Sequence, residues 1–278
     1  MNTDPMNTDP MNTDPMNPSE TTKPLDVTGV PCLTHDTAMR LQAAELRRTI
    51  EMLNSFDEHQ WTSQTDCPDW DVRRMYLHVL GACEGAASMV ENARQMLRAR
   101  RHQKANGGPL EAGLSAVQVH DRQTITAPAL LERLRGVAPR TIRKRTSLPG
   151  LLRRAVRFKV DGPVVEKWSV GYLVDTIYLR DLWMHRIDAS RAAGVNLELS
   201  ADHDGVIVDD IVAEWARRHG HPMRLTLTGV AGGTYVAKPD GAVDPVDVGE
   251  FDAVEFCRML AGRSDRPADG LLATVVPF

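Results

Sequence analysis

Residues 168–194 read WSVGYLVDTIYLRDLWMHRIDASRAAG, an apolar-rich stretch that we predict to be one long helix. Asp181, His185 and Asp188 occupy positions i, i+4 and i+7 of this helix, so their side chains lie on one face. A carboxylate and an imidazole one turn apart can supply two ligands to a divalent metal ion. A third ligand then has to come from another element.

His78 is the candidate for that third ligand. It stands in RRMYLHVLG between apolar neighbours, so we predict that it faces the interior of a helical bundle. Bundles build metal sites from such side chains on facing helices. Two imidazoles and one carboxylate suit Zn²⁺, Mn²⁺, Fe²⁺ or Ni²⁺ and leave a coordination position open for chemistry. The alternative is a core histidine bonded to a backbone carbonyl or to Asp181, with Asp181 and Arg180 in surface ion pairs, because D-x-x-x-H also arises by chance.

The composition is that of an ordinary globular protein. The chain has 278 residues, of which 42% are hydrophobic and 25% charged, and its net charge of −4 favours neither a nucleic-acid nor a membrane partner. No apolar run approaches the roughly 20 residues that span a bilayer, and the N-terminus lacks the apolar stretch of a secretory signal. We therefore expect a cytoplasmic protein without a membrane partner.

The cysteines show no C-x-x-C spacing, which argues against a zinc ribbon or a redox pair. We expect reduced thiols, so any thiol chemistry would use a thiol from outside the chain. The four residues are Cys32, Cys67, Cys83 and Cys257.

Three regions follow one another along the chain. The repeat MNTDP occurs three times at the start, and its composition predicts a disordered tail over residues 1–33. Residues 34–195 predict an all-helical unit without strands, with helices over 34–56, from Asp71 to about residue 100, near 114–122, after Thr126 and over 168–194. Residues 196–278 predict a small α+β domain, with helices near 204–218 and 251–262 and strands at 223–228 and 234–237.

Two segments, TDCPDWDVRRMYLHVLG and YLVDTIYLRDLWMHRIDASRAAG, resemble the signature segments of the mycothiol-dependent maleylpyruvate isomerase family, which belongs to the DinB-like metal-binding helical bundles. DAVEFCRMLAGR and the closing VVPF are similar to the C-terminal domain of that family. The resemblance implies a mainly α fold, with a DinB-like four-helix bundle followed by a small α+β C-terminal domain. It also implies that His78, Asp181 and His185 hold the metal. The family pattern has Glu where this chain has Asp181, and Gly is common where Asp69 stands.

The resemblance further implies a metal-dependent enzyme whose cofactors are a divalent ion, with zinc foremost, and mycothiol bound through its sulfur. A divalent cation lowers the pKa of a thiol and holds the thiolate beside a small-molecule substrate. Addition of the thiolate to the cis double bond of a maleylpyruvate-like acid would permit rotation, and elimination would give the trans product. Thiol transfer to an electrophile needs only the addition. The alternative is a noncatalytic metal-binding or stress-associated module of the same fold.

The resemblance also implies an arginine of the C-terminal domain near the site. Arg263 and Arg224 are the candidates, and the alternative for Arg263 is a helix C-cap. Asp188 is placed either to orient His185 or to face solvent.

Two other features have alternative readings. Ten Lys and Arg residues and no acidic residue occur from 133 to 159, which suits an anion or nucleic-acid patch. Phe158 is the one aromatic residue in that stretch, so a solvated face is favoured and nucleic acid is an unlikely partner. His219 and His221 have metal-like spacing, but we expect them in a turn between a helix and a strand.

Overall fold

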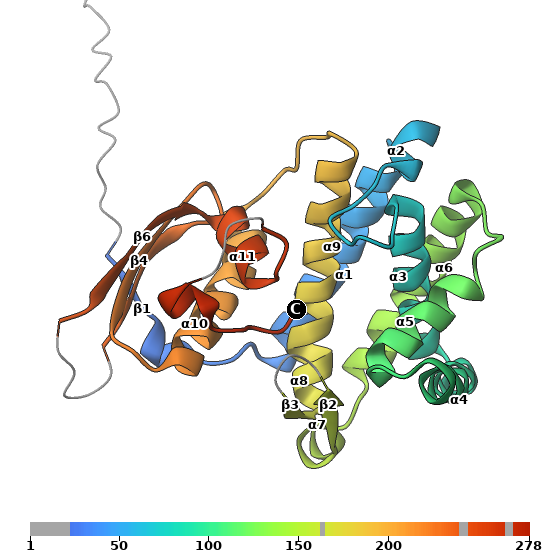
Figure 1. Cartoon of the computed structure of the whole chain (residues 1–278), viewed down its shortest axis with the longest axis horizontal. Helices are drawn as coiled ribbons and strands as arrows, with labels where there is room; N and C mark the ends of the chain where they lie inside the picture. The colour runs from blue at the N-terminus through green and yellow to red at the C-terminus, as the bar shows by residue number, and fades with distance from the viewer. Residues whose placement is uncertain (1–22, 162–164, 239–243, 265–268) are drawn as a thin grey trace, which may run out of the picture.

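The structure is a computed structural model that describes residues 23–161, 165–238, 244–264 and 269–278, so residues 1–22 of the predicted tail lie outside it. Helices gather on one side of the molecule and the larger sheet lies on the other (Figure 1). The helices are α1 (His35–Asn54), α2 (Glu58–Thr62), α3 (Val72–Ala87), α4 (Met89–Asn106), α5 (Leu110–His120), α6 (Ala127–Thr146), α7 (Gly150–Ala155), α8 (Val170–Tyr172), α9 (Tyr178–Ala192), α10 (Val206–His219) and α11 (Ala253–Leu260). The strands are β1 (Leu25–Asp26), β2 (Arg157–Asp161), β3 (Val165–Ser169), β4 (Met223–Thr228), β5 (Gly233–Ala237) and β6 (Val246–Asp252).

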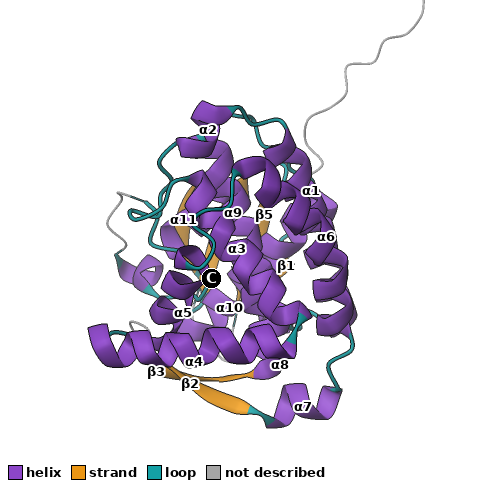
Figure 2. Ribbon diagram, turned by 90° about the vertical axis from the view of Figure 1, so that its right-hand side faces the viewer, coloured by secondary structure: helices purple, strands orange, loops and turns teal. Residues whose placement is uncertain are grey.

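The predicted four-helix bundle is confirmed. Helices α1 and α3 each pack against both α6 and α9, which closes a ring of four helices around one hydrophobic core. Asp71, the predicted N-cap of α3, accepts the backbone N–H of Arg74 (2.7 Å), and Thr34 caps α1 by accepting that of Thr37 (3.2 Å). Helices α4 and α5 pack together beside α3 (Figure 2).

Helix α9 belongs to two hydrophobic cores. Leu182 and Ala189 pack in the bundle, whereas Leu179, Trp183 and Ile187 pack with α10, α11 and the sheet. Helices α10 and α11 lie between α9 and the sheet (Figure 1). The C-terminal region is therefore built directly onto a helix of the bundle.

Two fully or almost fully buried arginines of α9 strengthen this junction. Each forms ion pairs with carboxylates outside α9, and a buried charge is tolerated only when it is paired in this way. The pairs are Arg180 with Asp210 and Glu214, and Arg186 with Glu45 and Asp204.

The C-terminal sheet has the strand order β1-β5-β4-β6. Strands β4 and β5 form an antiparallel hairpin, and β1 and β6 lie parallel to their neighbours. The hairpin turn is tight, because a Cβ at Gly232 would lie 2.1 Å from the carbonyl oxygen of Leu227. Strand β6, which the sequence analysis missed, contains Gly249 at φ 108 next to a register shift in its pairing with β4.

Residues 23–33 differ from the prediction that they belong to a disordered tail. Leu25 pairs with Tyr235 of β5, and Val27 is fully buried in the C-terminal core. A two-residue strand has too little sequence pattern to be predicted and depends on its long-range partner.

Two helix predictions also need correction. The helix expected from Asp71 to about residue 100 breaks at Ser88, which ends α3 and whose Oγ accepts the backbone N–H of Glu91 to start α4. The long helix expected over 168–194 begins at Val170, because Trp168 lies in the β2–β3 hairpin.

The sequence analysis expected no strands before residue 196, but β1, β2 and β3 all lie there. A π-helical turn, Leu173–Ile177, then precedes α9.

None of the described helices is long and apolar enough to cross a membrane.

We expect Val27→Ala to lower the free energy of unfolding by about 2 kcal/mol, because it leaves a cavity in the core that β1 and α10 close. Removal of residues 1–22 should leave the melting temperature unchanged, given the composition of the repeat. Thermal and urea denaturation of both variants check this. No loss for Val27→Ala would contradict the assignment of residue 25 onward to the folded part, and a large loss on truncation would contradict the prediction that the repeat does not pack.

Candidate metal centre

The structure brings together the three predicted metal ligands from two helices. His78 lies on α3, and Asp181 and His185 lie one turn apart on α9. One ligand atom of each residue lies within 4.8 Å of the other two. Asp181 Oδ1 is 3.2 Å from His185 Nε2, and the ring centroids of His78 and His185 are 5.7 Å apart. Ligand atoms on a tetrahedral ion stand about 3.4 Å apart, so small movements would let all three bind one ion.

Trp70 and Gly81 help to place His78. The Trp70 ring stacks on the His78 ring at 5.1 Å between centroids and 28° between planes. The Thr65 hydroxyl donates to the Trp70 carbonyl (2.7 Å) and fixes the turn before α3. A Cβ at Gly81 would lie 2.7 Å from the Cβ of Gln118, so glycine is what allows α5 to approach α3 here. The sequence analysis missed Trp70 as a site residue, although C-P-D-W was the signal for it.

Charge separates the roles of the two histidines. Burial lowers the pKa of His78 to about 4, so its imidazole is neutral at pH 7. Burial also disfavours the charged form of His185, but the carboxylates of Asp181 and Asp188 outweigh burial and raise the pKa of His185 to about 10. Burial opposes ionisation of Asp181 as well, yet the neighbouring His185 holds the pKa of Asp181 well below its usual range. A metal ion at this centre would therefore displace a proton from His185.

Asp188 lies at the opposite ring nitrogen of His185. Its side chain is fully buried, and Asp188 Oδ2 is 3.7 Å from His185 Nδ1. Of the two positions that the sequence left open, Asp188 therefore takes the one beside His185 and does not face solvent. A carboxylate there directs the other nitrogen of the imidazole toward a metal.

Arg263 is the candidate arginine that reaches the centre. Its Nε donates to Asp188 Oδ2 (2.8 Å), and its Nη2 lies 3.9 Å from Cys67 Sγ. Its Nη1 also donates to the carbonyl of Ala261 just after α11 (3.3 Å), so the predicted helix-capping role holds as well. Arg224 is exposed on β4 and is not part of the centre.

Several buried polar atoms of the centre have no hydrogen-bond partner in the described part of the chain. They are His78 Nδ1, both ring nitrogens of His185, and Asp188 Oδ1. Unpaired buried polar atoms are rare because each costs free energy, and a bound cation would compensate for them. The alternative of an ordinary core histidine would pair His78 with a backbone carbonyl or with Asp181; Nδ1 makes no such bond among the described residues, although the side chain of Gln118 lies close enough to act on the pKa of His78. The residues therefore fit a divalent ion.

Asp181 is a ligand candidate in contact with solvent. Its side chain is 32% exposed, whereas that of His185 is 5% exposed.

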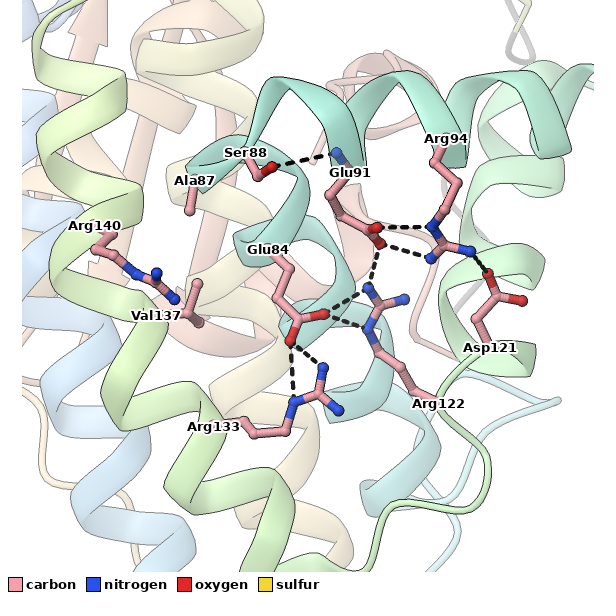
Figure 3. Close-up of a pocket in the computed structure, with 10 residues that line it drawn as sticks. All are labelled: Glu84, Ala87, Ser88, Glu91, Arg94, Asp121, Arg122, Arg133, Val137 and Arg140. Atoms are coloured by element: carbon pink, nitrogen blue, oxygen red, sulfur yellow. Dashed lines mark hydrogen bonds and ion pairs between the residues drawn. The ribbon is translucent and has the colours of Figure 1, made fainter.

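A pocket of about 430 Å³ lies further along α3 and involves none of the three predicted ligands (Figure 3). Three of its four arginines are paired: Arg122 bonds to Glu84 and Glu91, Arg94 bonds to Glu91 and Asp121, and Arg133 bonds to Glu84. These bonds join α3, α4 and the end of α5, so we assign the charges of this pocket to structure.

Glu45, His203 and Asp204 form another buried cluster of potential ligands. Arg186 bonds to both carboxylates, and His203 Nε2 lies 2.7 Å from Glu45. A guanidinium already supplies the positive charge there, so this cluster fastens α1 to α9.

His219 and His221 lie in the turn after α10, as expected. His219 Nδ1 accepts the backbone N–H of His221 (3.0 Å), and Gly220 has the positive φ of a helix C-cap. Burial lowers the pKa of His219 to about 4.

The family model described as the mycothiol maleylpyruvate isomerase N-terminal domain matches residues 42–190, which include all three predicted ligands and more than half of the chain. The chain belongs to this family. Two crystal structures of mycothiol-dependent maleylpyruvate isomerase, one of a histidine-to-alanine mutant, share the fold with TM-scores of 0.51 and identities of 15% and 14%. Each match covers 86% of this chain and 92% of the other chain. No curated protein sequence matches significantly.

Within the matched domain, this chain has Asp181 at the position where the family pattern has Glu. The shorter carboxylate still comes within 3.2 Å of His185 Nε2. Loss of one methylene therefore does not remove an oxygen from the centre.

We expect His78→Ala and His185→Ala each to abolish stoichiometric metal binding and to leave most of the helical circular dichroism intact, because each removes one ligand of a three-ligand site. Elemental analysis of the purified variants measures the bound metal. His59→Ala, at an exposed position on α2, is the matched control and should bind as the wild type does. Full metal in both site variants would refute the assignment.

Metal binding should strengthen about tenfold per pH unit between pH 6 and pH 8, because the ion displaces one proton from His185, whose pKa lies near 10. His78 contributes no further proton in this range, since its pKa lies near 4. Calorimetric titrations with zinc in buffers of different ionisation enthalpy count the released protons. A count near zero would show that the ion does not bind His185.

Proposed function

We propose that the protein is a metal-dependent enzyme that uses mycothiol as its thiol cofactor, and that it either isomerises a maleylpyruvate-like acid or transfers the thiol to an electrophile. The observation that supports this most is the convergence of His78, Asp181 and His185, one potential ligand atom of each lying within 4.8 Å of the other two. All three residues fall within the match to the family. Two imidazoles and a carboxylate suit zinc.

His78, Asp181 and His185 would hold the ion. When bound, the ion would lower the pKa of the cofactor thiol and keep the thiolate beside the substrate. The chain prepares this position through charge: His78 is neutral, and Asp181 is ionised. The cofactor and substrate would approach beside Asp181, whose side chain is 32% exposed.

Asp188 serves as a positioning residue. Asp188 Oδ2 lies 3.7 Å from His185 Nδ1, so its charge would favour a proton on Nδ1 and leave the Nε2 lone pair for the ion once the ion displaces the second proton. Arg263 in turn holds Asp188 through a charge-assisted hydrogen bond of 2.8 Å. The C-terminal region thereby sets the orientation of a ligand on α9.

Arg263 is also the residue that we propose to attract an acidic substrate. Its charge contributes to the low pKa of Asp181, so its guanidinium acts electrostatically at the centre. The carboxylate of a maleylpyruvate-like acid would pair with this guanidinium.

The second candidate is a noncatalytic metal-binding module of the same fold. The observation that favours it is the ion pair between Arg263 and Asp188. The Nε of Arg263 is already bonded in this pair, so that nitrogen is not free to bind an acidic substrate. Activity with mycothiol separates the two candidates, because the module would bind metal without turning over substrate.

We expect the zinc-loaded protein to convert maleylpyruvate to its trans isomer, or to attach mycothiol to an electrophile, only when mycothiol is present. Asp181→Ala should lower the rate about 100-fold or more because it removes a ligand, whereas Asp181→Glu should retain activity. Absorbance of the acid and mass spectrometry of the thiol adduct are the measurements. Asp202→Ala, at an exposed position, is the control.

Turnover without mycothiol, or unchanged turnover by Asp181→Ala, would refute the proposed mechanism. Stoichiometric zinc with no reaction on a panel of acids and electrophiles would favour the noncatalytic module.

A further inference from the structure

The segment made of α7, β2 and β3, which we name the basic tip (residues 150–161 and 165–169), leaves large apolar side chains in water. Leu151 is 75% exposed, Val165 59%, Val156 43% and Leu152 41%. The tip lies at the lower end of the molecule in both views (Figures 1 and 2). Leu151, Leu152 and Val156 lie in or next to α7, and Val165 lies at the far end of the hairpin. Exposed apolar side chains gathered in one segment are typical of a surface that meets a partner.

Cations cover the outward face of the β2–β3 hairpin. Arg157, Lys159 and Lys167 are exposed, whereas Phe158 and Val160 on the other face are covered. Lys159 stands directly opposite Lys167 in the antiparallel register. Like charges in a cross-strand pair are destabilising, so the tip accepts a cost that an anionic partner would remove.

The acidic residues of the tip neutralise only part of this charge. Glu166 is bonded to Arg218 and to the indole N–H of Trp168, and Asp161 pairs with Lys159. Arg154, Arg157 and Lys167 have no carboxylate partner in the described part of the chain.

The choice of partner follows from this combination of groups. A second copy of the chain that met this one tip to tip would place like charges against each other. Nucleic acid binds to exposed aromatic platforms, but Phe158 and Trp168 lie on the covered face of the hairpin. Anionic lipid headgroups pair with unpartnered cations, and aliphatic side chains such as Leu151 enter the boundary between headgroups and acyl chains.

We propose that the basic tip binds the surface of membranes that contain anionic lipids. No spanning helix is needed for such contact. The sequence expectation of no membrane partner came from the charge of the whole chain and the lack of a long apolar run, and neither describes a local surface. The basic stretch 133–159 divides between two roles. Arg133 bonds to Glu84 and Arg145 bonds to Gln42 within the bundle, whereas Arg154, Arg157 and Lys159 belong to the basic tip.

The test is sedimentation of the full chain with vesicles of phosphatidylcholine alone or mixed with phosphatidylglycerol. We expect binding only to the mixed vesicles and weaker binding at higher salt. Leu151→Ser should weaken binding about tenfold, and Lys167→Glu at least about fivefold. The matched controls are Val230→Ser, which is 62% exposed on the C-terminal region, and Arg224→Glu, which is exposed on β4; both should bind as the wild type does.

Equal binding by Leu151→Ser and Val230→Ser would overturn the proposal, as would absence of binding to the mixed vesicles. Binding to a nucleic-acid homopolymer in place of vesicles would show that the tip serves nucleic acid. A concentration-dependent dimer that Leu151→Ser dissociates would show that the tip joins two copies of the chain.

Discussion

Helix α9 packs against the bundle on one side and against α10, α11 and the sheet on the other, so eleven of its fifteen residues are buried. The charged and ionisable side chains among these buried residues are removed from water. Each of them must find a partner within the protein or bind one from outside. This constraint sorts the polar residues of α9 into two groups.

The arginine group is satisfied internally. Arg180 and Arg186 meet carboxylates of α1, α10 and the turn before α10, and these pairs fasten the two halves of the molecule together. The histidine group is different, because the ring nitrogens of His185 lack hydrogen bonds while carboxylates stand at both edges of the ring. The bundle adds His78 to this incomplete arrangement. The same burial that joins the domains thus prepares the candidate metal centre.

The sequence predicted the parts of the structure that depend on local pattern. Apolar spacing and the Asp71 cap predicted the bundle helices, and the i, i+4 spacing predicted that Asp181 and His185 share a face. The break at Ser88 was missed because a cap in the middle of a helical pattern resembles an ordinary polar residue. Strand β1 was missed because two residues gain stability only from pairing with β5. The bond between Arg263 and Asp188 joins residues 75 positions apart, so no local pattern indicates it.

X-ray absorption spectroscopy at the zinc edge, before and after addition of mycothiol, tests the metal centre most directly. Our account predicts only nitrogen and oxygen neighbours near 2.0–2.2 Å at first, and one sulfur near 2.3 Å once mycothiol is present. A sulfur neighbour before mycothiol is added would place zinc on Cys67 on the other side of His185. An unchanged spectrum after addition would contradict the proposed role of the ion in holding the thiol.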